Sequence, residues 1–234
     1  MTGLPLPDHA LPAVVSPQEW EAAHEAMLLE EKELTRARDA LAARRRRMPM
    51  TRVDTSYRFV TSQGEVGLLE LFQGRRQLLV YRFFFQPDVD GWPEKGCAGC
   101  SYLADHVPHL AHLNAWDTSF VVVSPASPEQ ITELQTRMGW RHIPWFSLPD
   151  DTFSRDFNVN EYFGLNVFLR DDHDQIYRTY YVSARGVEPL LPTLSMLDLT
   201  PLGRQEDWED TPTGRPQLPA YRARRHDEYP AAPH

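Results

Sequence analysis

The chain of 234 residues contains two cysteines, Cys97 and Cys100, and only two residues separate them. Such a pair suits a structural disulfide, part of a metal site, or a dithiol that cycles with a disulfide. A disulfide that closes so short a loop constrains the unfolded chain very little, so stability is a poor reason for it. A structural zinc site uses four protein ligands, and the sequence has no second cysteine pair. The spacing therefore favours a redox pair, with copper or zinc binding by the same thiolates as the alternative.

The segments around the pair predict how it is positioned. The apolar run QLLVYRFFF, residues 77–85, is typical of a strand that is covered on both faces. After a loop rich in proline, glycine and aspartate, the pattern becomes helical at Cys97. The unpaired N–H groups at a helix start stabilise an anion, and the thiolate is the attacking form of cysteine. We therefore predict Cys97 as the exposed nucleophile and Cys100, one turn deeper, as the resolving thiol.

Polar side chains near the pair leave alternatives open. Arg82, inside the apolar strand, either stabilises the thiolate or pairs with a carboxylate elsewhere. His106, His109 and His112 follow in steps of three and could complete a metal site. On a regular helix, however, His106 lies about 180° around the axis from Cys97. We favour solvated histidines, and we expect neither a metal nor a cofactor.

The chain divides into four predicted parts. Residues 1–15 form a flexible proline-rich arm, residues 16–48 a long helix, residues 49–205 the main domain, and residues 206–234 a proline-rich tail. The helix is predicted to begin at Ser16, because serine, proline and a glutamate three residues on form a capping box.

The N-terminal helix has one narrow apolar stripe. Trp20, Met27, Leu34 and Leu41 follow each other seven residues apart. So thin a stripe buries little by itself, so we expect the helix to lie on the domain or on a second subunit, which makes a homodimer possible. Arg44–Arg47 suit the C-terminal end of the helix dipole.

The order of elements predicts an α/β fold with a mixed sheet. Further strands are expected at residues 56–61, 65–72, 118–126 and 143–148, and helices at residues 127–140 and 185–197. Pro108 is expected to kink or split the helix that begins at the cysteines. Strands that alternate with helices imply parallel pairs, whereas a closing hairpin at residues 165–182 adds antiparallel neighbours.

The composition limits the partners. The net charge of −9 argues against nucleic acid, and no run approaches the roughly 18 apolar residues of a membrane span. The N-terminus lacks the pattern of a signal peptide, and a secreted chain would more often carry several cysteines. We therefore expect a soluble cytoplasmic protein with neither a nucleic-acid nor a membrane partner.

Several blocks together resemble one bacterial family. They are RVDTSYRF, LLELFQGRRQLLVYRFFF, GCAGCSYLADH, RMGWRHIPW and IYRTYYVSARGVEPLLPTLSMLDLTPLGRQEDW. The family is thioredoxin-like, is known as a domain of unknown function (DUF-899), and is described as predicted dithiol–disulfide oxidoreductases. The resemblance covers about residues 28–208. It implies a thioredoxin-like three-layer fold, with helices on both faces of the sheet and an added N-terminal helix.

The resemblance also implies an enzyme that acts on a protein or small-molecule disulfide through Cys97 and Cys100. The resemblance does not identify the reducing partner. More remotely, residues 143–159 and 166–178 resemble the second half of peroxiredoxins and of membrane-anchored thioredoxin-like proteins.

The sequence departs from the thioredoxin pattern at several positions. Leu165 stands where thioredoxins carry a cis-proline beside the redox pair. The acidic residue that thioredoxins bury behind the cysteines would fall near Tyr81 or Arg82, and neither is a carboxylate. Tyr102-Leu103 replaces an expected aromatic pair, and the peroxiredoxin arrangement Pro-x-x-x-Thr-x-x-Cys is missing. These departures predict that proton handling and partner docking differ from those of a general protein reductase.

Overall fold

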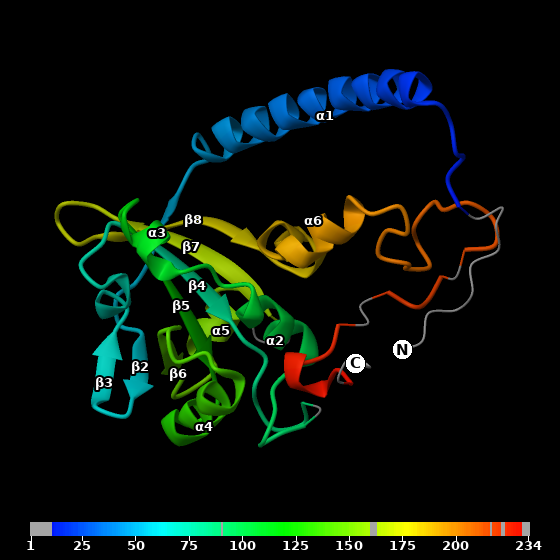
Figure 1. The fold of residues 1–234 in the computed structure, drawn as a ribbon. Helices are drawn as coiled ribbons and strands as arrows, with labels where there is room; N and C mark the ends of the chain where they lie inside the picture. Colours follow the sequence, from blue (N-terminus) through cyan, green and yellow to red (C-terminus); the bar gives the residue numbers. More distant parts are fainter. Residues whose placement is uncertain (1–10, 90, 160–162, 216, 221–222, 231–234) are drawn as a thin grey trace. The chain divides into compact units, whose positions relative to one another are not determined.

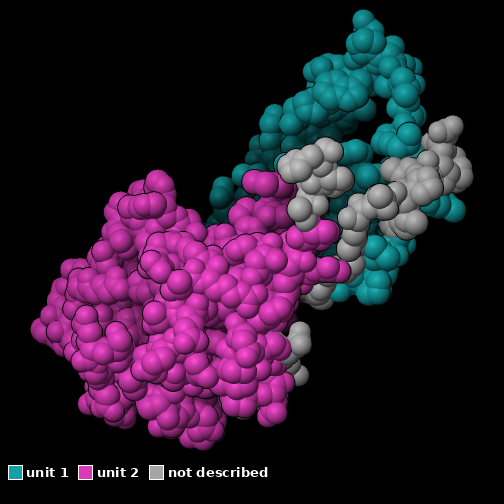
Figure 2. Space-filling model, turned by 60° about the horizontal axis from the view of Figure 1, so that its bottom comes forward, with its two compact units in different colours: residues 1–49, 198–220 teal, residues 50–197, 221–234 magenta. Residues whose placement is uncertain are grey.

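The computed structural model describes residues 11–89, 91–159, 163–215, 217–220 and 223–230. They form two compact units, coloured separately in Figure 2. Unit 1 comprises residues 1–49 and 198–220, and unit 2 comprises residues 50–197 and 221–234. Much of the proline-rich arm expected at residues 1–15 lies outside the described residues.

The described part of unit 2 is built on one eight-stranded sheet, in the order β1-β8-β7-β4-β5-β6-β2-β3 (Figure 1). The strands are β1 (Thr51–Arg52), β2 (Arg58–Thr61), β3 (Gly64–Gly67), β4 (Gln77–Arg82), β5 (Thr118–Ser124), β6 (Trp145–Ser147), β7 (Gly164–Arg170) and β8 (Ile176–Val182). β4, β5 and β6 are parallel, whereas β7 is antiparallel to β4 and forms the predicted hairpin with β8. The predicted mixed sheet is therefore confirmed.

Helices cover both faces of the sheet. The helices of unit 2 are α2 (Ala98–Asp105), α3 (Leu110–Asn114), α4 (Pro128–Met138), α5 (Thr152–Asp156) and α6 (Pro192–Asp198), which ends at the boundary with unit 1. One buried cluster joins Tyr81 and Phe83 to apolar residues of α2 and α4, and Leu194 of α6 packs against it. The cluster on the opposite face joins Val80 and Phe168 to α5. Alternate residues of β4 thus belong to different clusters, as expected for a strand that is covered on both sides.

Local signals set several helix boundaries correctly. α4 begins with a capping box at Ser127, with proline at its first position, and ends at Gly139, whose φ of 73° suits glycine. The chain between α2 and α3 leaves the helical conformation around Pro108, so the predicted split is confirmed.

Three predicted segments differ in the structure. Residues 70–72, predicted as strand, form a 3₁₀ helix, because Leu68, Leu71 and Phe72 point into one cluster with helical spacing. β4 ends at Arg82 and not at residue 85. The helix predicted at residues 185–197 is a 3₁₀ helix, Ala184–Leu190, with Pro189 inside it, followed by α6.

Unit 1 contains the long helix α1 (Pro17–Arg45). Its predicted start is confirmed, since Ser16 and Glu19 form the capping box, with backbone N–H to side-chain oxygen distances of 3.3 and 2.9 Å. No residue of α1 is buried. In the second segment of unit 1, Arg204 pairs with Asp198 at 2.7 Å and lies over the Trp208 ring.

Unit 2 has the thioredoxin-like arrangement, with a central β4 flanked by parallel β5 and antiparallel β7 and followed by a helix that starts at a cysteine. The sheet therefore fixes where the cysteine pair lies, at the carboxyl end of its central strand.

Among the described helices, none is long and apolar enough to cross a bilayer.

Replacing Phe168 with alanine should lower the free energy of unfolding by about 3–5 kcal/mol, because this ring is fully buried against Phe153 and Phe157. Denaturant unfolding followed by circular dichroism measures the change. Trp116→Ala is the matched control, since the Trp116 side chain is 81% exposed, and its effect should stay within about 0.5 kcal/mol. Equal effects of the two variants would contradict this account of the core.

Candidate functional site

The two cysteines lie in the first turn of α2, directly after the loop that follows β4. Cys97 is the N-cap residue, and its N–H donates to the carbonyl oxygen of Phe84 at 3.0 Å. Its own carbonyl oxygen accepts from the N–H and the hydroxyl of Ser101 at 2.9 and 3.0 Å. Cys97 is half-buried and Cys100 is fully buried, and both are free thiols. The structure thus brings the two predicted residues together at different depths.

Gly96 is required by the close approach of this loop to the core. A Cβ atom at Gly96 would lie 2.2 Å from the Cε1 atom of Phe83, whose ring is fully buried. Any larger residue would therefore displace the backbone that carries Cys97.

The surroundings of Cys97 favour its thiolate and lower its pKa to about 6. The largest influence is the Cys100 thiol, which acts as a hydrogen-bond donor to the sulfur. Burial opposes ionisation, but the Cys100 thiol, the N–H groups of Cys100 and Gly99 and the charge of Arg225 together outweigh it. The Cys97 thiol makes no capping hydrogen bond in the structure, and the helix N–H groups act on its sulfur through their partial positive charge.

Cys100 has the opposite behaviour. Burial raises the pKa of its thiol well above the usual value, and the neighbouring Cys97 raises it further. Two donors oppose this shift: the hydroxyl of Tyr81, and the N–H of Phe84, whose nitrogen is 3.4 Å from the Cys100 sulfur. One sulfur therefore ionises easily while the other keeps its proton.

Tyr81 is a buried residue of β4 that interacts with Cys100. Its side chain is 1% exposed and belongs to the same buried cluster as Cys100. Burial and the adjacent thiol raise the pKa of Tyr81 well above its usual value. The hydroxyl is thus a neutral donor toward the second sulfur.

Arg82 is buried and has no carboxylate partner among the described residues. Its guanidinium donates to the side-chain oxygen of Gln86 and lies 5.2 Å from the Phe84 ring centre. Its Nε and Nη1 atoms are buried without a partner in the described structure, and burial lowers its pKa to about 10. The charge of Arg225 favours the Cys97 thiolate, whereas the charge of Arg82 interacts with Cys100.

Arg225 comes from a segment far along the chain. Its side chain is 3% exposed, and its Nε and Nη2 atoms donate to the carbonyl oxygen of Gly96 at 2.8 and 2.6 Å. Its Nη1 atom binds both carboxylate oxygens of Glu228, at 2.9 and 3.1 Å. Glu228 also binds the Nζ atom of Lys95 at 2.5 Å. Lys95 and Arg225 together lower the pKa of Glu228 to about 2.

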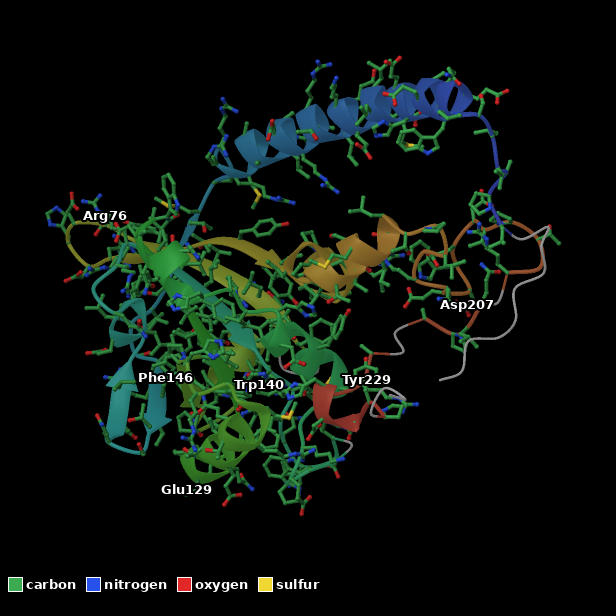
Figure 3. All side chains as sticks on the ribbon, viewed as in Figure 1. Arg76, Glu129, Trp140, Phe146, Asp207 and Tyr229 are labelled. Carbon is green, nitrogen blue, oxygen red and sulfur yellow. The ribbon has the colours of Figure 1, made fainter. Side chains whose placement is uncertain are left out.

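A further hydrogen bond and a further ion pair hold the same segment, which we call the C-terminal clasp and define as residues 223–230. His226 binds Asp105 of α2 at 2.6 Å, and Asp227 binds Arg137 of α4 at 2.5 Å. Asp105 also accepts from the indole N–H of Trp140 at 2.8 Å, and Trp140 is labelled in Figure 3. The clasp thus joins the cysteine loop, α2 and α4.

The histidines after the cysteines do not converge on them. We expected a solvated His106. It is half-buried, and its two ring nitrogens lie 2.5 Å from the Tyr102 carbonyl oxygen and from the Thr193 hydroxyl. His109 caps α3, where its Nδ1 atom accepts from Ala111 at 3.3 Å. In the described part of the chain, no three histidine, cysteine or acidic residues are placed to hold a metal ion.

Several partly buried aromatic side chains lie around the apolar cluster that contains Cys100. They pack against the same cluster as the cysteines and are Phe84, Trp92, Tyr102 and Phe163. Leu165, which we expect where thioredoxins carry a cis-proline, is buried opposite Tyr81 in β4.

Sequence reasoning missed Arg225 and Glu228, because it treated residues 206–234 as a tail. A signal was present: RARRHDE, residues 222–228, is a dense run of mixed charges within a proline-rich segment. Such a run can form several ion pairs with a folded surface, but nothing in it identifies the loop that it contacts.

Several solved structures are similar to this chain at low sequence identity. Among solved structures, the chain is similar to a peroxidoxin, BcpB, from Mycobacterium tuberculosis, with 16% identity, a TM-score of 0.41, and coverage of 64% of this chain and 99% of that one. It is similar to peroxiredoxin Q from Xanthomonas campestris, with 17% identity, a TM-score of 0.43, and coverage of 66% and 97%. It is also similar to an exposed lipoprotein thioredoxin from Streptococcus pneumoniae, with 11% identity, a TM-score of 0.38, and coverage of 59% and 98%.

No curated protein matches the sequence. Residues 9–229 match the family described as "Bacterial protein of unknown function (DUF899)". The match extends over nearly the whole sequence, including the cysteine pair and all but the last residue of the clasp. The chain therefore belongs to this bacterial family of unknown function.

Proposed function

We propose that this protein is a thiol–disulfide oxidoreductase in which Cys97 is the nucleophile and Cys100 is the resolving thiol. The observation that carries the proposal is the difference between two adjacent sulfurs. The pKa of Cys97 is lowered to about 6, while that of Cys100 is raised well above its usual value. With these values, roughly nine-tenths of Cys97 is thiolate at pH 7 while Cys100 remains a thiol.

The reaction has two steps. The Cys97 thiolate attacks one sulfur of a substrate disulfide, which forms a mixed disulfide and releases the other sulfur as a thiolate. Cys100 then loses its proton and attacks the Cys97 sulfur, which releases the second substrate thiolate and closes the Cys97–Cys100 disulfide. The substrate gains two electrons, the protein loses two, and an external dithiol must return them.

Formation of the mixed disulfide changes the surroundings of Cys100 in a way that favours its thiolate. Once Cys97 is in a mixed disulfide, its negative charge no longer raises the pKa of Cys100. The hydroxyl of Tyr81 and the N–H of Phe84 then remain as donors that favour the Cys100 thiolate. The substrate is a protein or small-molecule disulfide, and the reaction needs no cofactor.

The Cys100→Ser variant should accumulate the mixed disulfide on Cys97, because the resolving sulfur is absent. We expect the trapped adduct to be visible by intact-mass spectrometry after incubation with oxidised glutathione or with a disulfide-bonded peptide. Cys97→Ser should form no adduct, since Cys100 is buried and protonated. Equal labelling of both single variants would contradict the assignment of the nucleophile.

Arg225→Met should raise the pKa of Cys97, because it removes a positive charge that stabilises the thiolate. In the wild-type protein, the iodoacetamide rate should rise with pH around a midpoint near 6. In the variant the midpoint should move upward, by on the order of one pH unit or less, so that alkylation slows most at pH 5–6. Arg137→Met is the control, since it breaks another clasp contact, to Asp227. An unchanged midpoint in Arg225→Met would reject this influence.

Tyr81→Phe should slow the second step and leave the first unchanged, because it removes a donor to Cys100 but none to Cys97. With dithiobis(nitrobenzoate), the first thionitrobenzoate release should keep its rate, while the second should slow about tenfold. Tyr102→Phe, also beside the cysteines, serves as the control. If both releases slowed equally in Tyr81→Phe, the loss would reflect disturbed packing.

A further inference from the structure

Helix α1 presents a row of exposed apolar side chains. Trp20, Met27, Leu34 and Leu41 are 57%, 55%, 53% and 43% exposed, and Met48, just beyond the helix, is 49% exposed. Their spacing of seven residues keeps them on one side of the helix over its whole length. A row of apolar side chains along one side of a helix is typical of a helix that packs against another surface.

The charges of α1 are separated along its length. Residues 17–34 hold six glutamates and one lysine, whereas residues 35–47 hold six arginines and one aspartate. The N-terminal half is therefore strongly acidic and the C-terminal half strongly basic. A second copy of the same helix complements this pattern only in the antiparallel direction, because a parallel copy places like charges together.

The apolar stripe and the charge pattern have the same centre. The stripe is symmetric about Leu34, with Met27 and Leu41 seven residues away on either side. The change from acidic to basic also occurs directly after Leu34. Two independent patterns thus define one point about which the helix is complementary to itself, as a two-fold interface requires.

We propose that α1 pairs antiparallel with α1 of a second copy of this chain, with a two-fold axis at Leu34. In this register Leu34 contacts Leu34 of the second copy, and Met27 contacts Leu41. Glu31 and Arg38 flank the stripe on the same side and lie three residues before and four after its centre. Glu31 of each copy therefore faces Arg38 of the other copy, so the two-fold axis produces this pair twice.

Charge exchange tests the orientation in the full chain. Arg38→Glu should weaken dimerisation roughly tenfold, because two attractive pairs become two repulsive ones. The double variant Glu31→Arg, Arg38→Glu should restore the dimer, since each new arginine faces a new glutamate. Sedimentation equilibrium between about 1 and 100 μM protein measures the constants, and circular dichroism shows that the helix is retained. Arg36→Glu, on the opposite side of the helix, is the matched control and should weaken dimerisation less.

Cross-linking tests the register in a Cys97→Ser, Cys100→Ser background, where no native thiol competes. Leu34→Cys should form a disulfide-linked dimer under mild oxidation. Met27→Cys alone should not cross-link, because position 27 of one copy lies about 21 Å along the axis from position 27 of the other. Met27→Cys mixed with Leu41→Cys should cross-link.

Three results would overturn the proposal: a wild-type chain that stays monomeric over the whole concentration range, a Met27→Cys chain that cross-links to itself, or a dimer that persists in Leu34→Asp. The first would assign the stripe to packing within one chain, and the second to a parallel pair.

Discussion

The difference in depth between two sulfurs in one helical turn is the constraint on which the site depends. A thiolate is stable at Cys97 because helix N–H groups, a neighbouring thiol and a guanidinium surround it. Cys100, one turn inward, lies in the apolar cluster between the sheet and α2, where a charge is unfavourable. The central position of β4 produces this difference. The loop after β4 places the start of α2 at the edge of the buried cluster, so Cys97 is partly exposed and Cys100 is covered.

The clasp adds long-range support to a site that is otherwise local. Arg225 both fixes the carbonyl group of Gly96 and supplies charge near Cys97, so position and electrostatics come from the same side chain. Its own charge is compensated by Glu228, which in turn engages Lys95. A buried arginine needs such compensation, and the network gives the cysteine loop a defined geometry. Arg82, by contrast, has buried N–H groups without partners in the described structure and is the least satisfied polar residue near the site.

Sequence reasoning was most reliable where the signal is local. Capping boxes at Ser16 and Ser127 fixed two helix starts, and long apolar runs located β4 and β5. It failed at residues 68–72, where a short apolar run fits either strand or helix until its packing partners are known. Arg225 could not be placed, because it contacts a loop 129 residues earlier. Tyr81 was noted as a departure, but the sequence did not show that its hydroxyl would reach Cys100.

The separation of 129 residues between Gly96 and Arg225 has a consequence for protein synthesis. At typical elongation rates, the codons between Gly96 and Arg225 take on the order of ten seconds to translate. During that interval a nascent chain can already expose Cys97 outside the ribosome, while the guanidinium that favours its ionisation has not yet been made. A thiol that is less ionised during this period is less prone to premature coupling with other thiols, because the favoured thiolate forms only after residue 225 has been added.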